Sequence, residues 1–506
     1  MPELSQNLNL HLMVPEIALV ALGILILLAD LWMKKENRHQ LGWWAAIGIL
    51  VITVYSYWLG PKAGETQTAC QGLFRYDSFS LYVKLAFGLT GLLVCIMSVD
   101  WIRRTGRGQG EFFTIVVFAL TGMFLVSGVN DLMSMFVSLE LVTLCFFILA
   151  AFRRSDKRSG EAGIKYIIVG ALAAAFMLFG MAFIYGATGQ VRFDAIRAAI
   201  TTLGEGEQAT ALFGLVLLLV GLGFKVAAIP FHVWVPDVYQ GAPTPVTAFM
   251  SVGSKVAGFV LIIRVVTLVV AGAFSTELTA LFALIAGLTL FYGNLAAIPQ
   301  KNIKRLMGYS SIGHAGYLLM GVVAILVMQG AGQKYEMGLT AILFYILAYT
   351  FTNMAVFIGI IVFSAAGGRE HAIEDYAGLG KRSPLLAFCI TVALLSLAGV
   401  PPLAGFFGKF YLITSVVQAS QVEGHAGLLA LAAIGAVNVV ISMYYYLLVI
   451  KQMYIAEPTE EAQATPIAFG GLVKGVLIAC VVLIIVIGVF QGPVVEMASE
   501  VLATTP

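Results

Sequence analysis

Charged residues are scarce in this sequence. Only 11% of its 506 residues are Asp, Glu, Lys or Arg, whereas a soluble domain carries about 25%. With 60% hydrophobic residues, the chain is neither a disordered segment nor an ordinary cytosolic enzyme. The net charge of +2 gives no basis for a nucleic-acid partner. The composition therefore predicts an integral membrane protein.

Cysteine and histidine are also sparse and are not clustered. The five cysteines include no C-x-x-C pair, so they indicate neither a disulfide framework nor a zinc or iron–sulfur site. The six histidines are equally dispersed, which argues against a haem held by two histidines. A P-loop and a G-x-G-x-x-G turn are missing as well. We therefore expect no cofactor and no metal on this chain, and any redox chemistry on a partner chain.

Long apolar stretches occupy most of the chain. A helix needs about 20 residues to cross about 30 Å of hydrocarbon. By this criterion we predict an all-α, polytopic membrane protein with 14 transmembrane helices. The predicted spans are residues 15–33, 41–60, 77–99, 112–128, 131–151, 163–186, 210–231, 245–270, 279–298, 304–328, 337–363, 385–418, 427–450 and 473–491.

The loops between these spans predict an orientation. Cytoplasmic loops of membrane proteins collect Lys and Arg. One alternate set of loops, which includes Arg107 and Arg369, holds 19 of the 29 Lys and Arg residues. The other set, which includes Lys62, holds 5. We therefore expect both termini on the outer side of the membrane.

Two ionisable residues fall near the middle of predicted spans. A charge at a helix centre costs about 2.5–3.5 kcal/mol on insertion scales, so an intramembrane charge indicates a functional site. Glu140 follows Asp131 by nine residues, which places it about 13 Å into its helix. Lys255 follows Pro245 by ten residues, or about 15 Å. Side chains that only hold helices together would fit the same positions.

Two further lysines lie beside predicted helix breaks. Lys225 precedes Pro230 by five residues, and Lys409 follows the pair Pro401 and Pro402. Proline donates no backbone hydrogen bond, so it frees a carbonyl one turn back, and at membrane depth such a break lines protein or a water-filled cavity. Each lysine with its break therefore predicts a hydrated cavity. The simpler alternatives are a lysine that extends to the membrane surface and a packing kink.

His314 lies deep in a long apolar run, with Ser310, Ser311 and Tyr317 close by in the sequence. Histidine titrates near neutrality, which suits proton transfer, although a histidine that only packs and hydrogen-bonds is an equal alternative. The hydroxyl groups of its neighbours are suited to holding water. We therefore include His314 among the candidate proton-transfer residues.

Three other residues are given structural roles. Lys84 and Arg264 lie nearer to span ends, and we expect their long side chains to reach the membrane surface. Trp234 lies near another span end and is expected at the membrane–water interface.

The candidate residues form a series along the predicted bundle. If Glu140 and Lys225 pair, each holds the other ionised, and their separation pushes Lys225 to release its proton. Lys255, His314 and Lys409 would extend the series through water. The sequence therefore predicts a lateral proton path whose energy arrives from a partner chain or an ion gradient.

The chain resembles the antiporter-like membrane subunits of respiratory complex I and of multisubunit cation/proton antiporters. The resemblance is carried by three segments, GFKVAAIPFHVWVPDVYQGAPTPVTAFMSVGSKVAG, QKNIKRLMGYSSIGHAGY and GVPPLAGFFGKF. It implies inverted repeats formed by helices 4–8 and 9–13, with helices 7 and 12 discontinuous. It also implies that Glu140, Lys225, Lys255 and Lys409 are the channel residues.

The resemblance further implies a domain division. Residues 1–110 would form the first three helices, residues 111–272 and 273–453 the two repeats, and residues 454–506 a loop and the last helix. Some family members carry a glutamate in place of Lys409, and others continue into a long lateral helix, whereas this chain ends at Pro506. Neither of those two branches is therefore expected.

The implied function is proton translocation in a respiratory NADH:quinone oxidoreductase of the bacterial inner membrane. The implied partners are the other membrane and peripheral subunits of a hetero-oligomeric complex, which would hold FMN, iron–sulfur clusters and quinone. Two alternatives stay open. One is a subunit of a sodium/proton antiporter or a hydrogenase-type relative, and the other is a purely structural membrane subunit.

Overall fold

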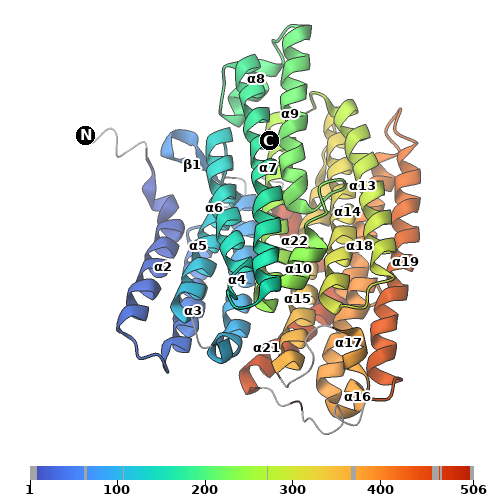
Figure 1. The fold of residues 1–506 in the computed structure, drawn as a ribbon. Helices are drawn as coiled ribbons and strands as arrows, with labels where there is room; N and C mark the ends of the chain where they lie inside the picture. The colour runs from blue at the N-terminus through green and yellow to red at the C-terminus, as the bar shows by residue number, and fades with distance from the viewer. Residues whose placement is uncertain are drawn as a thin grey trace.

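The computed structural model describes residues 8–61, 65–105, 108–270, 272–365, 372–458, 467 and 470–501. In this part of the chain, 13 helices are long and apolar enough to cross a membrane. They lie side by side, with α2 and α3 at one edge and α19 at the other (Figure 1). The predicted all-α membrane fold is confirmed. Lys62, Arg107, Arg369 and Pro506, which entered the sequence predictions, lie outside the described residues.

The N-terminal helices are joined by short turns and one hairpin. The 3-10 turn η1 (Leu10–Met13) leads into α2 (Val14–Trp32), and η2 (Arg38–Gln40) leads into α3 (Leu41–Trp58), which is followed by α4 (Ser78–Thr105). Between α3 and α4, β1 (Gln67–Ala69) pairs antiparallel with β2 (Phe74–Tyr76) around η3 (Cys70–Gly72), with Ala69 opposite Phe74. This small hairpin is a strand pair that the sequence prediction lacked.

The next part of the chain leads to the first helix break. Its elements are α5 (Gln109–Ser127), α6 (Leu132–Ala150), α7 (Lys157–Thr188), α8 (Phe193–Ile200), α9 (Glu205–Val226) and α10 (Val235–Gly241). One continuous helical segment follows, made of α11 (Thr244–Phe249), the π-helical turn η4 (Met250–Ser254), α12 (Lys255–Arg264) and the π-helical turn η5 (Val265–Val270).

The later part of the chain contains the second break. Its elements are α13 (Ser275–Ala297), α14 (Ile303–Gly330), α15 (Glu336–Ala365), η6 (Ile373–Tyr376), α16 (Leu379–Arg382), α17 (Pro384–Ala398), α18 (Ala404–Ala419), α19 (Leu428–Tyr454), α21 (Gly471–Val489) and α22 (Gly492–Glu500). The span predicted at 385–418 is therefore two helices of 15 and 16 residues, too short to count among the 13.

Both predicted discontinuities are present. α9 ends at Val226, five residues before the predicted end, because Ala227 adopts a left-handed conformation (φ 62°). α17 ends where Gly399 adopts φ 89°, a conformation that glycine reaches without a side-chain clash. Pro230 follows the first end, and Pro401 and Pro402 follow the second, so in each case the chain restarts as a new helix after a proline.

Burial separates inner helices from outer ones. In each helix we compare the most apolar stretch of 18 residues. This stretch is completely buried in Thr244–Val270 and in Ile303–Gly330, whereas only a third of it is buried in α2 and in α7. The outer faces of α2, α3, α7 and α19 carry exposed apolar side chains. Because lipid or other apolar surfaces must cover these faces, the buried α12 and α14 form the centre of the subunit.

Candidate functional site

Lys225 lies in the last turn of α9 and is buried. Its ammonium group contacts the hydroxyl oxygen of Thr143 on α6. Glu140, on the same helix, is half-buried, and the structure has no ion pair within 4.0 Å between these two described residues. Glu140 and Lys225 therefore form no direct ion pair in the described chain. The Lys225 ammonium group contacts Thr143 instead, three residues after Glu140 on α6, and the Glu140 carboxylate remains within electrostatic range.

Protein groups satisfy the break after α9. The indole of Trp234 donates to the carbonyl oxygen of Phe224 at 3.2 Å, and Ile229 N donates to the hydroxyl of Thr289 at 3.1 Å. Trp234 is buried, and its ring stacks on Tyr166 with 4.5 Å between centroids. The expectation of an interfacial Trp234 is wrong, because the ring is buried against Tyr166 and its N–H is a second donor to the Phe224 carbonyl, which also accepts from Ala227 N at 3.1 Å.

Lys255 is the first residue of α12 and follows the π-helical turn η4. Its buried ammonium group contacts both the backbone carbonyl and the hydroxyl of Ser311 on α14. One turn further along α12, Gly258 lies against α9, since a β-carbon there would be 3.1 Å from Cβ of Lys225. The two lysines therefore lie on helices that touch at this glycine.

The Ser311 hydroxyl joins Lys255 to two tyrosines. It lies 3.2 Å from the hydroxyl of Tyr239 on α10 and accepts a hydrogen bond of 3.2 Å from Tyr349 on α15. The Lys255 ammonium also lies 5.4 Å from the centroid of the Tyr349 ring. A hydroxyl both donates and accepts, so this group is able to pass a proton in either direction.

Both ring nitrogens of His314 are hydrogen-bonded. Nδ1 contacts the hydroxyl of Tyr345 on α15, and Nε2 lies 3.1 Å from the hydroxyl of Tyr446 on α19. The Tyr446 hydroxyl also contacts that of Ser310. A neutral imidazole carries one donor and one acceptor, so His314 is placed to receive a proton on one side and release it on the other.

A small cavity lies between His314 and the second break. Its volume is about 10 Å³, the lower limit for a single water molecule. Its polar lining comes from α14, α15 and α17 and consists of His314, Tyr345, Tyr349, Thr352 and Ser396.

Lys409 lies on α18 and folds back against the break. Its ammonium group donates to the carbonyl oxygen of Ala398 at 3.2 Å and to the hydroxyl of Ser442 at 3.3 Å. It also lies 5.0 Å from the centre of the Tyr317 ring. A β-carbon at Gly399 would be 3.3 Å from Cδ of Lys409. The sequence predicted that a helix break frees a backbone carbonyl, and the Ala398 carbonyl at the end of α17 is such an acceptor.

The candidate residues differ in their surroundings. Lys255 and His314 lie in two separate hydroxyl clusters, which meet where the rings of His314 and Tyr349 pack with 5.1 Å between centroids. Glu140 makes no direct contact with Lys225 in the described chain. Pro230 is exposed, and so are Pro401 and Pro402. Both breaks therefore reach the outer surface of the chain.

Several buried polar residues were missed in the sequence. These are Tyr239, Tyr345, Tyr349, Tyr446 and Lys304. The pair Tyr345 and Tyr349, four residues apart on one helix face, was a readable signal in an otherwise apolar run. Lys304, the first residue of the span predicted at 304–328, is buried and contacts the carbonyl of Ala242.

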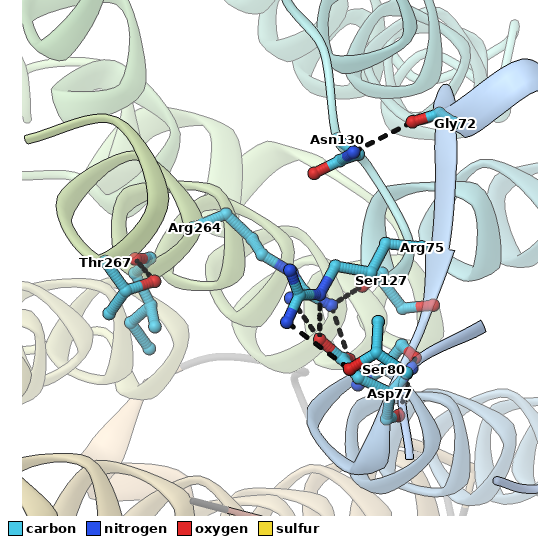
Figure 2. A network of polar contacts seen from close by, with 10 residues as sticks. Gly72, Arg75, Asp77, Ser80, Ser127, Asn130, Arg264 and Thr267 are labelled. Atoms are coloured by element: carbon cyan, nitrogen blue, oxygen red, sulfur yellow. Dashed lines mark hydrogen bonds and ion pairs between the residues drawn. The ribbon is translucent and has the colours of Figure 1, made fainter. Parts of the chain in front are cut away.

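Arg264 does not reach the membrane surface as expected. It is only 1% exposed and binds both carboxylate oxygens of Asp77, at 2.6 and 2.8 Å (Figure 2). A third hydrogen bond of 2.9 Å joins it to the carbonyl of Ser127. Arg75 also lies 2.8 Å from Asp77. The acid, which lies 187 positions earlier in the sequence, removes any need for the guanidinium to reach water.

The prediction that the Lys84 side chain reaches the membrane surface is also wrong. It is fully buried, and its ammonium lies 2.6 Å from the Glu16 carboxylate on α2. The same ammonium lies 4.3 Å from the centre of the Tyr76 ring. A carboxylate and an aromatic face together compensate a buried cation, so Lys84 joins α2 to α4 inside the protein.

In the described part of the chain, no group of three or more His, Cys, Asp and Glu side chains is arranged to hold a metal ion. The buried polar groups that extend from Lys225 through Lys255 and His314 to Lys409, which we call the buried line, are instead lysines, hydroxyls and one imidazole. Such groups exchange protons and hydrogen bonds. The arrangement can therefore carry protons between helices.

Comparison with known proteins agrees with this geometry. A family model described as NADH:quinone oxidoreductase/Mrp antiporter, TM matches residues 129–442. An NADH-quinone oxidoreductase subunit N of Trichlorobacter lovleyi is 40% identical over 461 residues, covering 91% of this chain and 90% of the relative.

Two solved structures share the fold. One chain of respiratory complex I from Thermus thermophilus is 31% identical, with a TM-score of 0.76 and coverage of 96% of this chain and 99% of that one. A chain of the Mrp complex from a Dietzia species has a TM-score of 0.82 at 21% identity, covering 98% and 97% of the two chains. The second likeness shows the fold alone. The chain belongs to the NADH:quinone oxidoreductase/Mrp antiporter transmembrane family and, within it, to the NADH-quinone oxidoreductase subunit N proteins.

Proposed function

We propose that this chain is the proton-translocating subunit N of a bacterial NADH:quinone oxidoreductase. It is a multi-pass membrane subunit of a hetero-oligomeric complex, and it relays protons while partner subunits carry out the redox reaction. FMN, iron–sulfur clusters and quinone belong to those partners in this proposal. The relatives named subunit N and the fold shared with a complex I chain support it.

The observation that carries the proposal is a difference between two kinds of buried cation. Lys84 and Arg264 each contact a carboxylate. Lys225, Lys255 and Lys409 are equally buried, but within the described residues no carboxylate lies within 4.0 Å of their ammonium groups. A buried ammonium with only neutral acceptors is not locked in its charged form, so it can release a proton when another positive charge approaches.

The path runs across the bundle. Lys225 is adjacent to Thr143 and within range of Glu140, and Lys255 reaches Ser311 and its hydroxyl network. His314 continues the line through its two tyrosine contacts. In the described chain, direct hydrogen bonds do not join Lys255 to Lys225, the Ser311 cluster to His314, or His314 to Lys409, so internal water completes these three steps in our proposal.

Two finer points belong to the same proposal. Both termini lie on the periplasmic side, which the uneven distribution of Lys and Arg supports. Residues 111–272 and 273–453 form inverted repeats between an N-terminal part (1–110) and a C-terminal part (454–506). The support is that each repeat contains one broken helix, after α9 and after α17, with a buried lysine beside it.

Arginine substitutions test the relay. Arginine keeps the positive charge but does not deprotonate in proteins. Lys255→Arg and Lys409→Arg should therefore reduce proton pumping by the purified complex in vesicles, measured by dye quenching during NADH oxidation. Lys84→Arg is the matched control, because Lys84 needs only its charge, and it should pump normally.

The same assay separates the alternatives. A structural role predicts that Lys225→Ala and Lys409→Ala lower the yield of assembled complex but leave pumping per complex intact. An antiporter role predicts that transport depends on sodium. Normal pumping by the arginine variants would contradict the relay.

A further inference from the structure

A polar cavity lies away from the buried line, at the membrane boundary where four helix ends meet. Its volume is about 270 Å³, and it lies between the end of α6, the start of α7, the junction of α10 with α11, and the start of α14. Its charged lining consists of Arg153, Arg158 and Lys304 with one acid, Asp156. We call it the basic cavity, since three cations face one carboxylate.

The local sequence builds this cavity. Asp156 caps α7 by accepting the backbone N–H of Arg158 at 3.0 Å, and it lies 3.9 Å from the guanidinium of Arg153. Gly241 brings the end of α10 against the first turn of α7, because a β-carbon there would be 2.5 Å from the carbonyl oxygen of Arg158. Lys304 closes the inner side and contacts the Ala242 carbonyl. Among the residues that line the cavity, three cations thus face one acid, and one oxygen of that acid caps α7.

A second cavity of about 180 Å³ adjoins the first and shares Arg158. There, acids balance the bases. Asp237 lies 2.6 Å from Lys165 and 2.5 Å from Arg305, and Glu161 lies 2.7 Å from Lys165. An anion is therefore favoured in the basic cavity and not in its neighbour.

An apolar track starts beside these cavities. Ile164, Ile168 and Leu172 are each more than half exposed and lie four residues apart on α7. This spacing places them in one stripe along the helix. Leu172 lies 14 residues beyond Arg158, or about 21 Å along the helix axis, which is the scale of an acyl chain in one leaflet.

We propose that the basic cavity binds the phosphate of an anionic phospholipid, with an acyl chain lying along the track on α7. Basic pockets between transmembrane helices bind anionic headgroups. Arginine presents a planar set of donors that matches phosphate oxygens. The cavity supplies the charge, and the adjacent stripe requires an apolar cover, so one lipid molecule satisfies both features.

Photolabelling of the intact complex tests the proposal. The complex is placed in phosphatidylcholine vesicles that contain a phosphatidylglycerol with a diazirine in its acyl chain. After irradiation, mass spectrometry of peptides should locate the label on residues 161–172. The pair Arg153→Gln and Arg158→Gln should lower this labelling at least about tenfold, because charge-assisted hydrogen bonds to the phosphate are lost.

The control pair is Arg154→Gln and Lys157→Gln. These residues belong to the same segment and are exposed, but they do not line the cavity. This pair removes the same charge, so it should leave the labelling unchanged. Equal losses in the two pairs, or no label on α7 in the unmodified complex, would overturn the proposal. If the first double variant fails to assemble, Arg158→Gln alone provides the same comparison with Arg154→Gln.

Free phosphate is distinguished from lipid by competition. Unlabelled phosphatidylglycerol should displace the label, whereas millimolar inorganic phosphate should not. If inorganic phosphate competes as well as the lipid does, the cavity is a site for a free anion, and the lipid assignment is wrong.

Discussion

The guanidinium of Arg264 binds both carboxylate oxygens of Asp77, at 2.6 and 2.8 Å (Figure 2). This bond joins the last turn of α12 to the residue just before α4. Both side chains are buried, so each charge depends on the other. Lys409 is also buried, but its ammonium group donates to a carbonyl and a hydroxyl, and no carboxylate of the described residues lies within 4.0 Å of it. The fold therefore contains cations held in place by acids and cations whose charge is free to change.

Asp77→Asn should destabilise the subunit by about 3–5 kcal/mol, because it leaves the Arg264 charge buried without its counter-charge. The effect should appear as a lower temperature for dissociation of the purified complex. Pumping per assembled complex should remain, since neither residue belongs to the proton path.

Two comparisons sharpen this test. The double variant Asp77→Leu with Arg264→Met removes both charges and should recover much of the loss. Asp194→Asn breaks an exposed pair with Arg192 and should cost less than about 1 kcal/mol. If the single and double variants at the buried site lose the same stability, the pair does not act as a unit.

The positions of the helices were predictable because length and hydropathy determine them. The span predicted at 304–328 is α14 (Ile303–Gly330), and the prolines marked both breaks. The end of α9 was misplaced by five residues, because a left-handed Ala227, and not the proline, ends the helix.

The partners of the buried charges were not predictable from one sequence. Glu16 meets Lys84 across 68 positions of sequence, and such a pairing depends on which helices pack together. For the same reason, the contacts of His314 with Tyr345 and Tyr446 emerge only when α14, α15 and α19 are assembled. A charged residue in an apolar run indicates a site, but tertiary packing decides whether an acid lies beside it.

Tyr446→Phe should slow coupled proton pumping. The hydroxyl that is lost contacts both Nε2 of His314 and the Ser310 hydroxyl. Removal of one proton-transfer group commonly costs a factor of about 100 or more, although neighbouring water would reduce this to about tenfold. The measurement is the rate of proton uptake in vesicles per electron transferred.

The neighbouring Tyr445→Phe is the matched control for that change. Its hydroxyl donates to Asn294 at 3.0 Å and also interacts with Tyr446 and Ser310, but it makes no direct contact with His314 within the described chain. Both variants lose one buried hydroxyl from the same turn of α19. Equal pumping losses would show that the effect is general to this turn and not specific to His314.

The ion pairs of Asp237 predict a pH dependence outside the membrane-spanning helices. Burial acts to raise the pKa of Asp237, but hydrogen bonds from Lys165 and Arg305 outweigh it and hold the pKa below the ordinary value. A carboxyl with a lowered pKa in the folded state stabilises that state above the ordinary pKa of about 3.9. This contribution is lost as the pH falls below that value.

The matching variant is Asp237→Asn. The difference in dissociation temperature between this variant and the unmodified complex should be constant from pH 7 to pH 5 and should shrink below about pH 4. A difference that grows as the pH falls would mean that the carboxyl is destabilising when ionised.

Gly399→Ala tests whether the second break positions Lys409. Gly399 has φ 89°, and Gly424, in the loop after α18, has φ 83°, so alanine at either position costs about 1–2 kcal/mol through the backbone. Only at Gly399 does the new β-carbon meet the lysine, 3.3 Å from its Cδ, because nothing lies within 4 Å at Gly424. The ammonium should therefore shift from the Ala398 carbonyl only in Gly399→Ala. We expect this variant to lose most of its pumping while Gly424→Ala pumps normally. If the two assembled variants pump equally, the position of Lys409 beside the break is not required for pumping.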